Sequence, residues 1–351
     1  MWLSFICGIG HQQRIHRRAK RPHNAPQKEA AMSEAYIVEA IRTAGGRRNG
    51  ALSGVHPTDL AAVILNALVD RTGVDPAAID DVIMGCVTQA GEQGTHVGRN
   101  AVLASGLPDS VPAVSIDRQC GSSQQAIQFA AQAVMSGTQD MVIAAGVESM
   151  SRVPMGSDMN SYRAAGLGFS PWSGAALARY GVSRFDQFTG AQMIARKYGF
   201  SREDADRFAL SSHRKCAAAV QADAFAAEIV PVAVTRPDGS AGVHRADEGL
   251  RADASLEALA GLKPVIEGAV VTAGNASQIC DGASGVLIVN ERALKTHGLK
   301  PIARIDNLTV TAGDPVVMLE EPINATQRAL KRAGRSIGEI DLYEVNEAFA
   351  P

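Results

Sequence analysis

The sequence contains no apolar run long enough to cross a lipid bilayer. Its longest apolar stretches, such as residues 141–147 and 285–289, fall far short of the roughly 20 residues that a transmembrane helix needs. Positive charge is not in excess either, because the formal net charge is -2 at pH 7 and the pI is near 6.5. Nucleic-acid-binding proteins instead carry basic surfaces that neutralise phosphates. We therefore expect a cytoplasmic protein whose partners include neither a membrane nor a nucleic acid.

Paired cysteines are also missing. The five cysteines are scattered, and no two of them form a Cys-x-x-Cys pair: Cys7, Cys86, Cys120, Cys216 and Cys280. This pattern predicts neither a disulfide framework nor a zinc site, and it indicates a reducing compartment. No metal-ligand spacing relates four of the histidines, His96, His213, His244 and His297. We expect no metal site.

Residues 1–31 differ in composition from the rest of the chain. They are rich in Arg, Lys and His, contain no acidic residue before Glu29, and precede Met32, after which a strand-like run begins. Such a leader is typical of a transit peptide, and it also arises when an upstream start codon is assigned in error. We favour the second explanation and expect the fold to begin at Met32.

Short β-rich runs alternate with helical stretches from residue 36 onward, which predicts an α/β fold. The predicted strands are 36–40, 81–86, 113–116, 141–145, 285–290 and 303–308. The runs 113–116 and 141–145 are apolar at consecutive positions, as in strands that are buried on both faces. A predicted helix over 121–135 lies between them.

An internal repeat is visible in the frame Arg-x-Gly-x5-Ile-Asp, which fits residues 71–80 and again residues 332–341. Each copy closes a helix with a glycine, Gly73 or Gly334, and leads into a predicted strand. The repeat indicates duplicated α/β halves, although a single ten-residue match can also arise by chance.

A long stretch, 149–274, separates the two copies and contains predicted helices over 190–198 and 202–219. We interpret this stretch as an inserted lid or substrate-binding domain. The second copy reaches a predicted strand over 342–345 shortly before Pro351. A half that ends there leaves sheet edges and apolar faces uncovered, so we expect the second half to be incomplete.

One cysteine lies where the chain turns from the strand 113–116 into the helix 121–135. Its sequence context is Asp117-Arg-Gln-Cys120-Gly-Ser-Ser-Gln-Gln-Ala126. The unpaired N–H groups and positive dipole end of a helix N-terminus stabilise a thiolate, and small neighbours let a thioester approach. On placement alone, however, a buried structural cysteine is the commoner explanation.

Four motifs together are similar to those of thiolases in order and spacing. They are the run 117–126, Gly146-Val-Glu-Ser-Met-Ser151, Thr272-Ala-Gly-Asn-Ala-Ser277 with Asp281-Gly-Ala283, and Asn346-Glu-Ala-Phe-Ala350. The resemblance spans residues 32–351. It implies duplicated α/β halves in a five-layered αβαβα thiolase fold, with an N-terminal domain over 32–292, a loop domain at about 150–275, and a truncated C-terminal domain over 299–351.

The chain looks like a 3-ketoacyl-CoA thiolase, that is, an acetyl-CoA C-acyltransferase of fatty-acid or related β-oxidation. The resemblance implies thiolytic cleavage of 3-oxoacyl-CoA by coenzyme A through an acyl-Cys120 thioester, with a Claisen condensation as the reverse reaction. Acyl-CoA and coenzyme A would be substrates, and no cofactor would be needed. The complete protein would form a homodimer or homotetramer.

The resemblance also implies roles for single residues. Cys120 would be the nucleophile, and its backbone N–H would help to form an oxyanion hole. Asn346 would hold a water that binds the enolate oxygen. Ser277 would contact the pantetheine and Arg251 the nucleotide end of coenzyme A, while Phe349 would line the pantetheine tunnel. Without the resemblance, we would favour an ordinary turn residue, helix cap, solvated charge and core residue as the explanations of these last four.

Two thiolase motifs, Gly-His-Pro and Cys-x-Gly-Gly-Gly, do not occur in the sequence. The resemblance places both beyond Pro351, and we interpret this as a C-terminal truncation. One alternative is therefore an inactive thiolase remnant that lacks the C-terminal His and Cys and is poorly soluble. A second is a ketoacyl-synthase-like condensing enzyme, which the last two motifs disfavour. We expect residues 166–185 to set acyl specificity.

Overall fold

The computed structural model describes residues 33–351 except residues 169 and 237. The leader predicted over 1–31 lies outside the described residues. Residues 33–351 cluster as one unit. The domain boundaries inferred from the sequence stay predictions.

A mixed sheet forms the centre of the fold, and within the described residues it has eight strands in the order β10-β1-β9-β5-β3-β4, with β2 beside β9 and β6 beside β1. The bounds are β1 (Ala35–Thr43), β2 (Gly46–Arg47), β3 (Asp81–Gly85), β4 (Ala113–Ile116), β5 (Met141–Ser149), β6 (Ile229–Val230), β9 (Cys280–Val289) and β10 (Ala303–Ile305). Strands β4, β3 and β5 are parallel, whereas β9 runs antiparallel to both β5 and β1. The carboxyl ends of β3, β4 and β5 therefore meet at one edge of the sheet.

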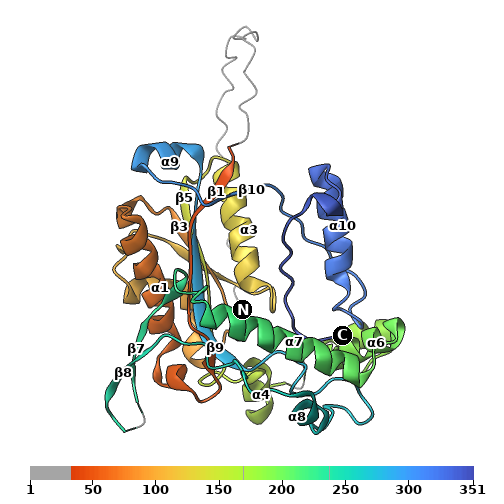
Figure 1. The fold of residues 1–351 in the computed structure, drawn as a ribbon. Helices are drawn as coiled ribbons and strands as arrows, with labels where there is room; N and C mark the ends of the chain where they lie inside the picture. The colour runs from red at the N-terminus through yellow and green to blue at the C-terminus, as the bar shows by residue number, and fades with distance from the viewer. Residues whose placement is uncertain (1–32, 169, 237) are drawn as a thin grey trace, which may run out of the picture. The chain divides into compact units, whose positions relative to one another are not determined.

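Helices cover both faces of this sheet. Figure 1 shows α1 (Pro57–Thr72) on one face and α3 (Ser122–Met135) on the other. Along β5, Met141 and Ile143 belong to one buried cluster with Leu68 of α1. The alternate residue Val142 belongs to a second cluster with Ala130 of α3. Because successive side chains of a strand point to opposite faces, a strand covered on both sides must be apolar at every position, and this confirms the prediction for 141–145.

The predictions for the other strands are confirmed in part. The runs 36–40, 81–86 and 285–290 correspond to β1, β3 and β9, while β10 ends earlier than predicted, at Ile305. The run 113–116 forms β4, but the prediction that both of its faces are buried is wrong, since Val114 is 40% exposed. β4 is the last strand in the sheet order, so less of it is covered.

The internal repeat is confirmed in its helical part. α1 ends at Gly73 and α10 (Glu321–Ala333) ends at Gly334, and both glycines adopt the left-handed conformation. Each is followed by a short 3₁₀ helix, η2 (Pro76–Ala78) or η4 (Ile337–Glu339). The strand predicted over 342–345 is wrong: these residues pair with no strand among the described residues. An extended segment without a neighbouring strand has no partners for its backbone hydrogen bonds, which explains the difference from β3.

The stretch between the repeats is mainly helical, and the predicted helices 190–198 and 202–219 correspond to α6 and α7. Its elements are α4 (Ser157–Ala164), α5 (Gly174–Tyr180), α6 (Gln187–Tyr198), α7 (Arg202–Gln221), the hairpin β7 (Val232–Thr235) and β8 (Ala241–His244), and α8 (Leu256–Ala260). The remaining helices are η1 (Ala51–Gly54), η3 (Gly91–Gln93), α2 (Val97–Ala104) and α9 (Glu291–His297). Of the helices in the described part of the chain, none has the length and apolar composition to span a membrane.

Candidate active site

Cys120 lies in a tight turn between the end of β4 and the start of α3. Its side chain is exposed, so a buried structural cysteine is excluded. The preceding residue, Gln119, has a φ of 48°, in the left-handed region that non-glycine residues rarely adopt. The hydroxyl of Ser122 accepts a hydrogen bond from the Arg118 N–H at 2.9 Å and donates one to the Gln119 carbonyl at 2.6 Å. These bonds hold the strained turn in place.

The helix behind Cys120 begins without a side-chain cap. The N-cap residue is Gly121, which makes no side-chain cap bond, and of the first N–H groups that of Ser122 donates to the Gln119 carbonyl at 3.0 Å. The N-terminus of an uncapped helix presents unpaired N–H groups and a partial positive charge. An oxyanion that forms at the Cys120 turn would be stabilised by these groups.

The loop after β3 is fastened beside this turn by a carboxylate. Glu148, near the end of β5, accepts hydrogen bonds from the N–H groups of Val87 at 2.8 Å and Thr88 at 3.2 Å, and from the side-chain amide of Gln93 at 2.9 Å. The Cys86 N–H donates to the Ile116 carbonyl at 3.0 Å. The carboxyl ends of β3, β4 and β5 are thus joined into one platform that carries Cys120.

The third and fourth sequence motifs lie side by side, although they are far apart in the chain. The Ser277 N–H donates to the Ala348 carbonyl at 2.8 Å, and the Ala350 N–H donates to the Asn275 carbonyl at 2.9 Å. Ala276 and Phe349 face each other in an antiparallel bridge. Two of the predicted coenzyme-binding residues, Ser277 and Phe349, are thereby brought together.

This pair of segments packs against α6 and is hydrogen-bonded to α7. The ring of Phe349 meets that of Phe188 edge to face, with centroids 5.3 Å apart. The buried side-chain amide of Asn275 donates to Asp206 at 2.9 Å, and the Asn275 oxygen accepts from the Thr272 N–H at 2.8 Å. Since every one of these groups is partnered, the motif around Ser277 is held in one conformation.

Arg251 lies on a segment that contacts both α7 and the segment after Ser277. Its N–H donates to Nδ1 of His213 at 3.3 Å, and the Gln278 amide donates to the Gly249 carbonyl at 2.6 Å. Burial lowers the pKa of His213, the positive charge of Arg251 lowers it further, and Glu347 opposes the shift. His213 is therefore neutral near pH 7 and able to accept this bond.

The fourth motif is tied to the same helix. The Ser212 hydroxyl donates to the Glu347 carboxylate at 2.6 Å, which places Asn346, the exposed neighbour of Glu347, near α7. The structure thus gathers Arg251, Ser277, Asn346 and Phe349 around α7. It does not join them to Cys120, because no hydrogen bond or ion pair of the described residues links the Cys120 turn to these segments.

Sequence reasoning missed the supporting residues of this site. Ser212 and His213 lie within a helix whose existence the sequence predicts, but nothing in its pattern distinguishes them from other half-buried polar residues. The roles of Phe188, Gln278 and Glu148 also follow only from long-range contacts, although Glu148 lies within the motif 146–151.

Two other features were considered as sites. An open hollow of about 590 Å³ is lined by residues that include His56, Glu92 and Asn100, but by none of the predicted site residues. Within residues 33–351, apart from 169 and 237, no three His, Cys, Asp or Glu side chains are grouped so that they could hold a metal ion. The Cys120 turn and the α7 region are therefore the candidate site.

Comparison with known proteins identifies the family that the chain resembles. The family model of the thiolase N-terminal domain matches residues 35–292, and that of the thiolase C-terminal domain matches residues 299–351. A steroid 3-ketoacyl-CoA thiolase of Mycobacterium tuberculosis is 50% identical, covering 92% of this chain and 78% of the relative. A 3-ketoacyl-CoA thiolase of Erwinia tasmaniensis is 42% identical, covering 91% of this chain and 81% of the relative.

Solved structures are similar as well. The acetyl-CoA acetyltransferase of Bacillus anthracis aligns with a TM-score of 0.80 at 34% identity, covering 91% of this chain and 81% of that one. The human mitochondrial 3-ketoacyl-CoA thiolase aligns with a TM-score of 0.79 at 34% identity, covering 92% and 82%. The sequence and the fold thus lead to the same family.

Proposed function

The chain belongs to the thiolase family of acyltransferases, and from this premise we propose that it cleaves 3-oxoacyl-CoA with coenzyme A through an acyl thioester on Cys120. The sulfur of Cys120 attacks the 3-oxo carbon, and the bond between C2 and C3 breaks. The acyl group stays on the sulfur, and acetyl-CoA leaves as an enolate that takes up a proton. The thiol of coenzyme A then attacks the thioester, which releases the shortened acyl-CoA and frees Cys120.

The observation that carries the proposal is the position of Cys120, exposed at the uncapped N-terminus of α3 in a chain of this family. Exposure gives a thioester access to the sulfur, and the backbone N–H of Cys120 is proposed to help bind the oxyanion. Asn346 supplies a polar side chain for the enolate oxygen, and its exposure leaves the amide free for a water.

Coenzyme A is proposed to bind over the α7 region. Ser277 and Phe349 lie on adjacent segments and contact the pantetheine, and Arg251 contacts a phosphate at the nucleotide end. The Arg251 guanidinium donates to the Glu248 carbonyl at 3.1 Å and pairs with no carboxylate among the described residues. It therefore keeps donors for a phosphate. The reaction uses no metal or redox cofactor, and we place the protein in the cytoplasm as a homodimer or homotetramer.

The acyl group is proposed to be steroid-derived. Identity is 50% with the steroid thiolase of M. tuberculosis, against 42% with a beta-ketoadipyl-CoA thiolase of Acinetobacter baylyi. The stretch from α4 to α5 presents apolar side chains to solvent, among them Tyr162 and Leu167 at 61% and 71% exposure, and neither helix buries a residue. Because α4 and α5 bury no side chain in the core, this segment can change its conformation to accommodate a bulky acyl group.

The test is acylation of Cys120. Because the sequence contains no Gly-His-Pro motif, the readout is the acyl adduct, followed by intact-protein mass spectrometry, and not turnover. We expect an adduct with a steroid-side-chain 3-oxoacyl-CoA that maps to Cys120, forms less with 3-oxoadipyl-CoA, is removed by coenzyme A, and is absent from Cys120→Ser. An adduct that persists in Cys120→Ser, or no adduct at any pH from about 7 to 9, where a growing fraction of a normal thiol ionises, contradicts the proposal.

A further inference from the structure

The segment that carries Arg251, residues 247–251, is fixed to the end of β1 by an ion pair. The guanidinium of Arg42 donates to both oxygens of Asp247, at 2.7 and 3.1 Å, and Asp247 also accepts from the Gly45 N–H at 2.7 Å. The side chains of Arg42 and Asp247 are only 29% and 20% exposed, so water screens the pair incompletely. This two-pronged geometry makes the contact directional as well as strong.

Further contacts fix the rest of the segment. Glu248 accepts from the N–H groups of Arg47 at 3.0 Å and Ala51 at 3.1 Å, and its own N–H donates to the Gly45 carbonyl at 2.9 Å. At the other end, Gln278 bonds to the Gly249 carbonyl, as described above. A side chain at position 249 would collide with Gln278, whose Oε1 lies 2.3 Å from where a Cβ would be. The glycine thus permits a close approach that links the segment to Ser277.

Arg42 is itself held from two other directions. It donates to Glu228 at 2.6 Å, and its guanidinium lies over the ring of Phe225, 5.2 Å from the ring centre. Burial alone would raise the pKa of Asp247, but the hydrogen bonds from Arg42 and Gly45 outweigh it and hold that pKa below its usual value. Asp247 is therefore charged near neutral pH, and the pair is intact there.

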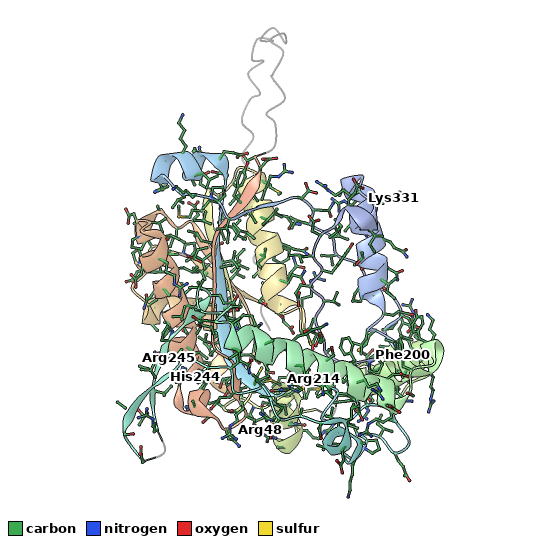
Figure 2. All side chains as sticks on the ribbon, viewed as in Figure 1. Arg48, Phe200, Arg214, His244, Arg245 and Lys331 are labelled. Carbon is green, nitrogen blue, oxygen red and sulfur yellow. The ribbon has the colours of Figure 1, made fainter. Side chains whose placement is uncertain are left out.

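The negative and positive side chains of segment 247–251 have different kinds of partner. Both carboxylates, Asp247 and Glu248, turn inward to donors of residues 42–51, and the single cation, Arg251, is left with carbonyl partners. Figure 2 shows Arg214 on α7, one residue after His213, and Arg245 just before the segment. The cation that segment 247–251 itself offers to an anion is Arg251.

We propose that Asp247, together with Arg42 and Gln278, acts as a positioning residue for coenzyme A: it holds segment 247–251 so that Arg251 presents its guanidinium to a phosphate of the nucleotide. The inference rests on the proposed function, in which Arg251 contacts that end of coenzyme A. None of the three positioning residues touches the reacting atoms. Their loss is expected to weaken binding of the nucleotide and to leave the chemistry at Cys120 in place.

The experiment compares two ligands by calorimetric titration of the full chain. Coenzyme A contains the nucleotide, whereas pantetheine lacks it. We expect Asp247→Asn to weaken coenzyme A binding about three- to tenfold, the loss of a charged hydrogen bond, and to leave pantetheine binding unchanged. The matched control is Asp140→Asn, which removes a carboxylate from an ion pair with Arg292 just before the start of β5. This variant should change the binding of neither coenzyme A nor pantetheine.

Two further variants separate positioning from general damage. Gln278→Ala removes only the bond to Gly249 from an exposed side chain, so the fold is not at risk, and it should weaken coenzyme A binding in the same selective way. If Asp247 acts through Arg251, the double variant Asp247→Asn/Arg251→Ala binds coenzyme A no more weakly than Arg251→Ala alone.

The outcomes also distinguish this inference from the proposed function. Additive losses in the double variant, equal weakening of both ligands, or unchanged binding by both Asp247→Asn and Gln278→Ala overturns the positioning role. The positioning role is also overturned if the wild-type chain acquires the Cys120 adduct but binds coenzyme A no more tightly than pantetheine. A wild-type chain that neither forms the adduct nor binds coenzyme A overturns the proposed function and the inference with it.

Discussion

Two cysteines at neighbouring strand ends, Cys86 after β3 and Cys120 after β4, have opposite surroundings. Cys86 is buried, and burial, together with the nearby negative charge and hydrogen bond of Glu148, raises the pKa of its thiol. Cys120 is exposed on a turn at a helix N-terminus. Since the thiolate is the reactive form and needs access to its partner, Cys86 is disfavoured on both grounds, whereas Cys120 is accessible.

This contrast predicts selective alkylation. With iodoacetamide at pH 8, we expect Cys120 to react at least roughly tenfold faster than Cys86, because the Cys86 thiol stays protonated and covered. Peptide mapping after timed quenching gives both rates in one sample. In urea the two rates should converge, and a native Cys86 that reacts as fast as Cys120 would mean that the β3 loop is not packed as described.

At the scale of elements, the close contact between α1 and β9 depends on a glycine. A Cβ at Gly285 would lie 2.6 Å from Ile64 Cγ2 and 2.9 Å from Leu68 Cδ1, both of which are core side chains. Gly282, on the same strand, has no such neighbour: the nearest atom to its Cβ position is Thr43 Oγ1 at 3.5 Å. The two glycines therefore serve different purposes, and only Gly285 sets the distance between helix and sheet.

Gly285→Ala is accordingly expected to destabilise the protein by ~1–3 kcal/mol, the usual cost of overpacking a well-filled core. Gly282→Ala is the matched control and should change the free energy of unfolding much less. Urea denaturation followed by circular dichroism measures both. If both variants lose the same free energy of unfolding, the cause is the reduced backbone freedom of the strand. The contact with Ile64 and Leu68 is then not the cause.

At the scale of the whole molecule, the residues after α10 are unusual in exposing large apolar side chains in sequence. Ile337, Leu342 and Val345 are 62%, 89% and 62% exposed, and α10 itself buries no residue. In Figure 1 this helix stands on the side of the sheet that α3 covers. Exposed apolar side chains, combined with backbone groups that have no strand partner, favour self-association.

We therefore expect the double variant Leu342→Lys/Val345→Lys to reduce self-association without a loss of stability, because neither side chain contributes to the core. Size-exclusion chromatography with light scattering over a concentration series measures the association. Val243→Lys, which places a charge at a 49% exposed site on the β7–β8 hairpin, is the control and should have little effect. An unchanged mass distribution in the double variant would exclude this surface as the cause.

Local sequence patterns predicted much of the fold. Consecutive apolar residues over 141–145 require cover on both faces, and α1 and α3 supply it. The glycines that end α1 and α10 follow from the left-handed conformation that a helix end needs, which an L side chain resists. Four spaced motifs identified the family, and the turn at Cys120 follows from a strand, three small residues and a helix.

The tertiary structure decided what depends on partners distant in sequence. A run such as 113–116 has the same pattern whether the strand is central or last in the sheet, and residues 342–345 form a strand only if another strand lies beside them. The pairing of 275–277 with 348–350, and the anchoring of Arg251 through Asp247 and Arg42, join residues about 70 or about 200 positions apart. The sequence alone determined local conformation and family, because those depend on near neighbours and on short motifs. The assembly of the proposed coenzyme-binding region depended on which polar groups the folded chain brings within hydrogen-bonding distance.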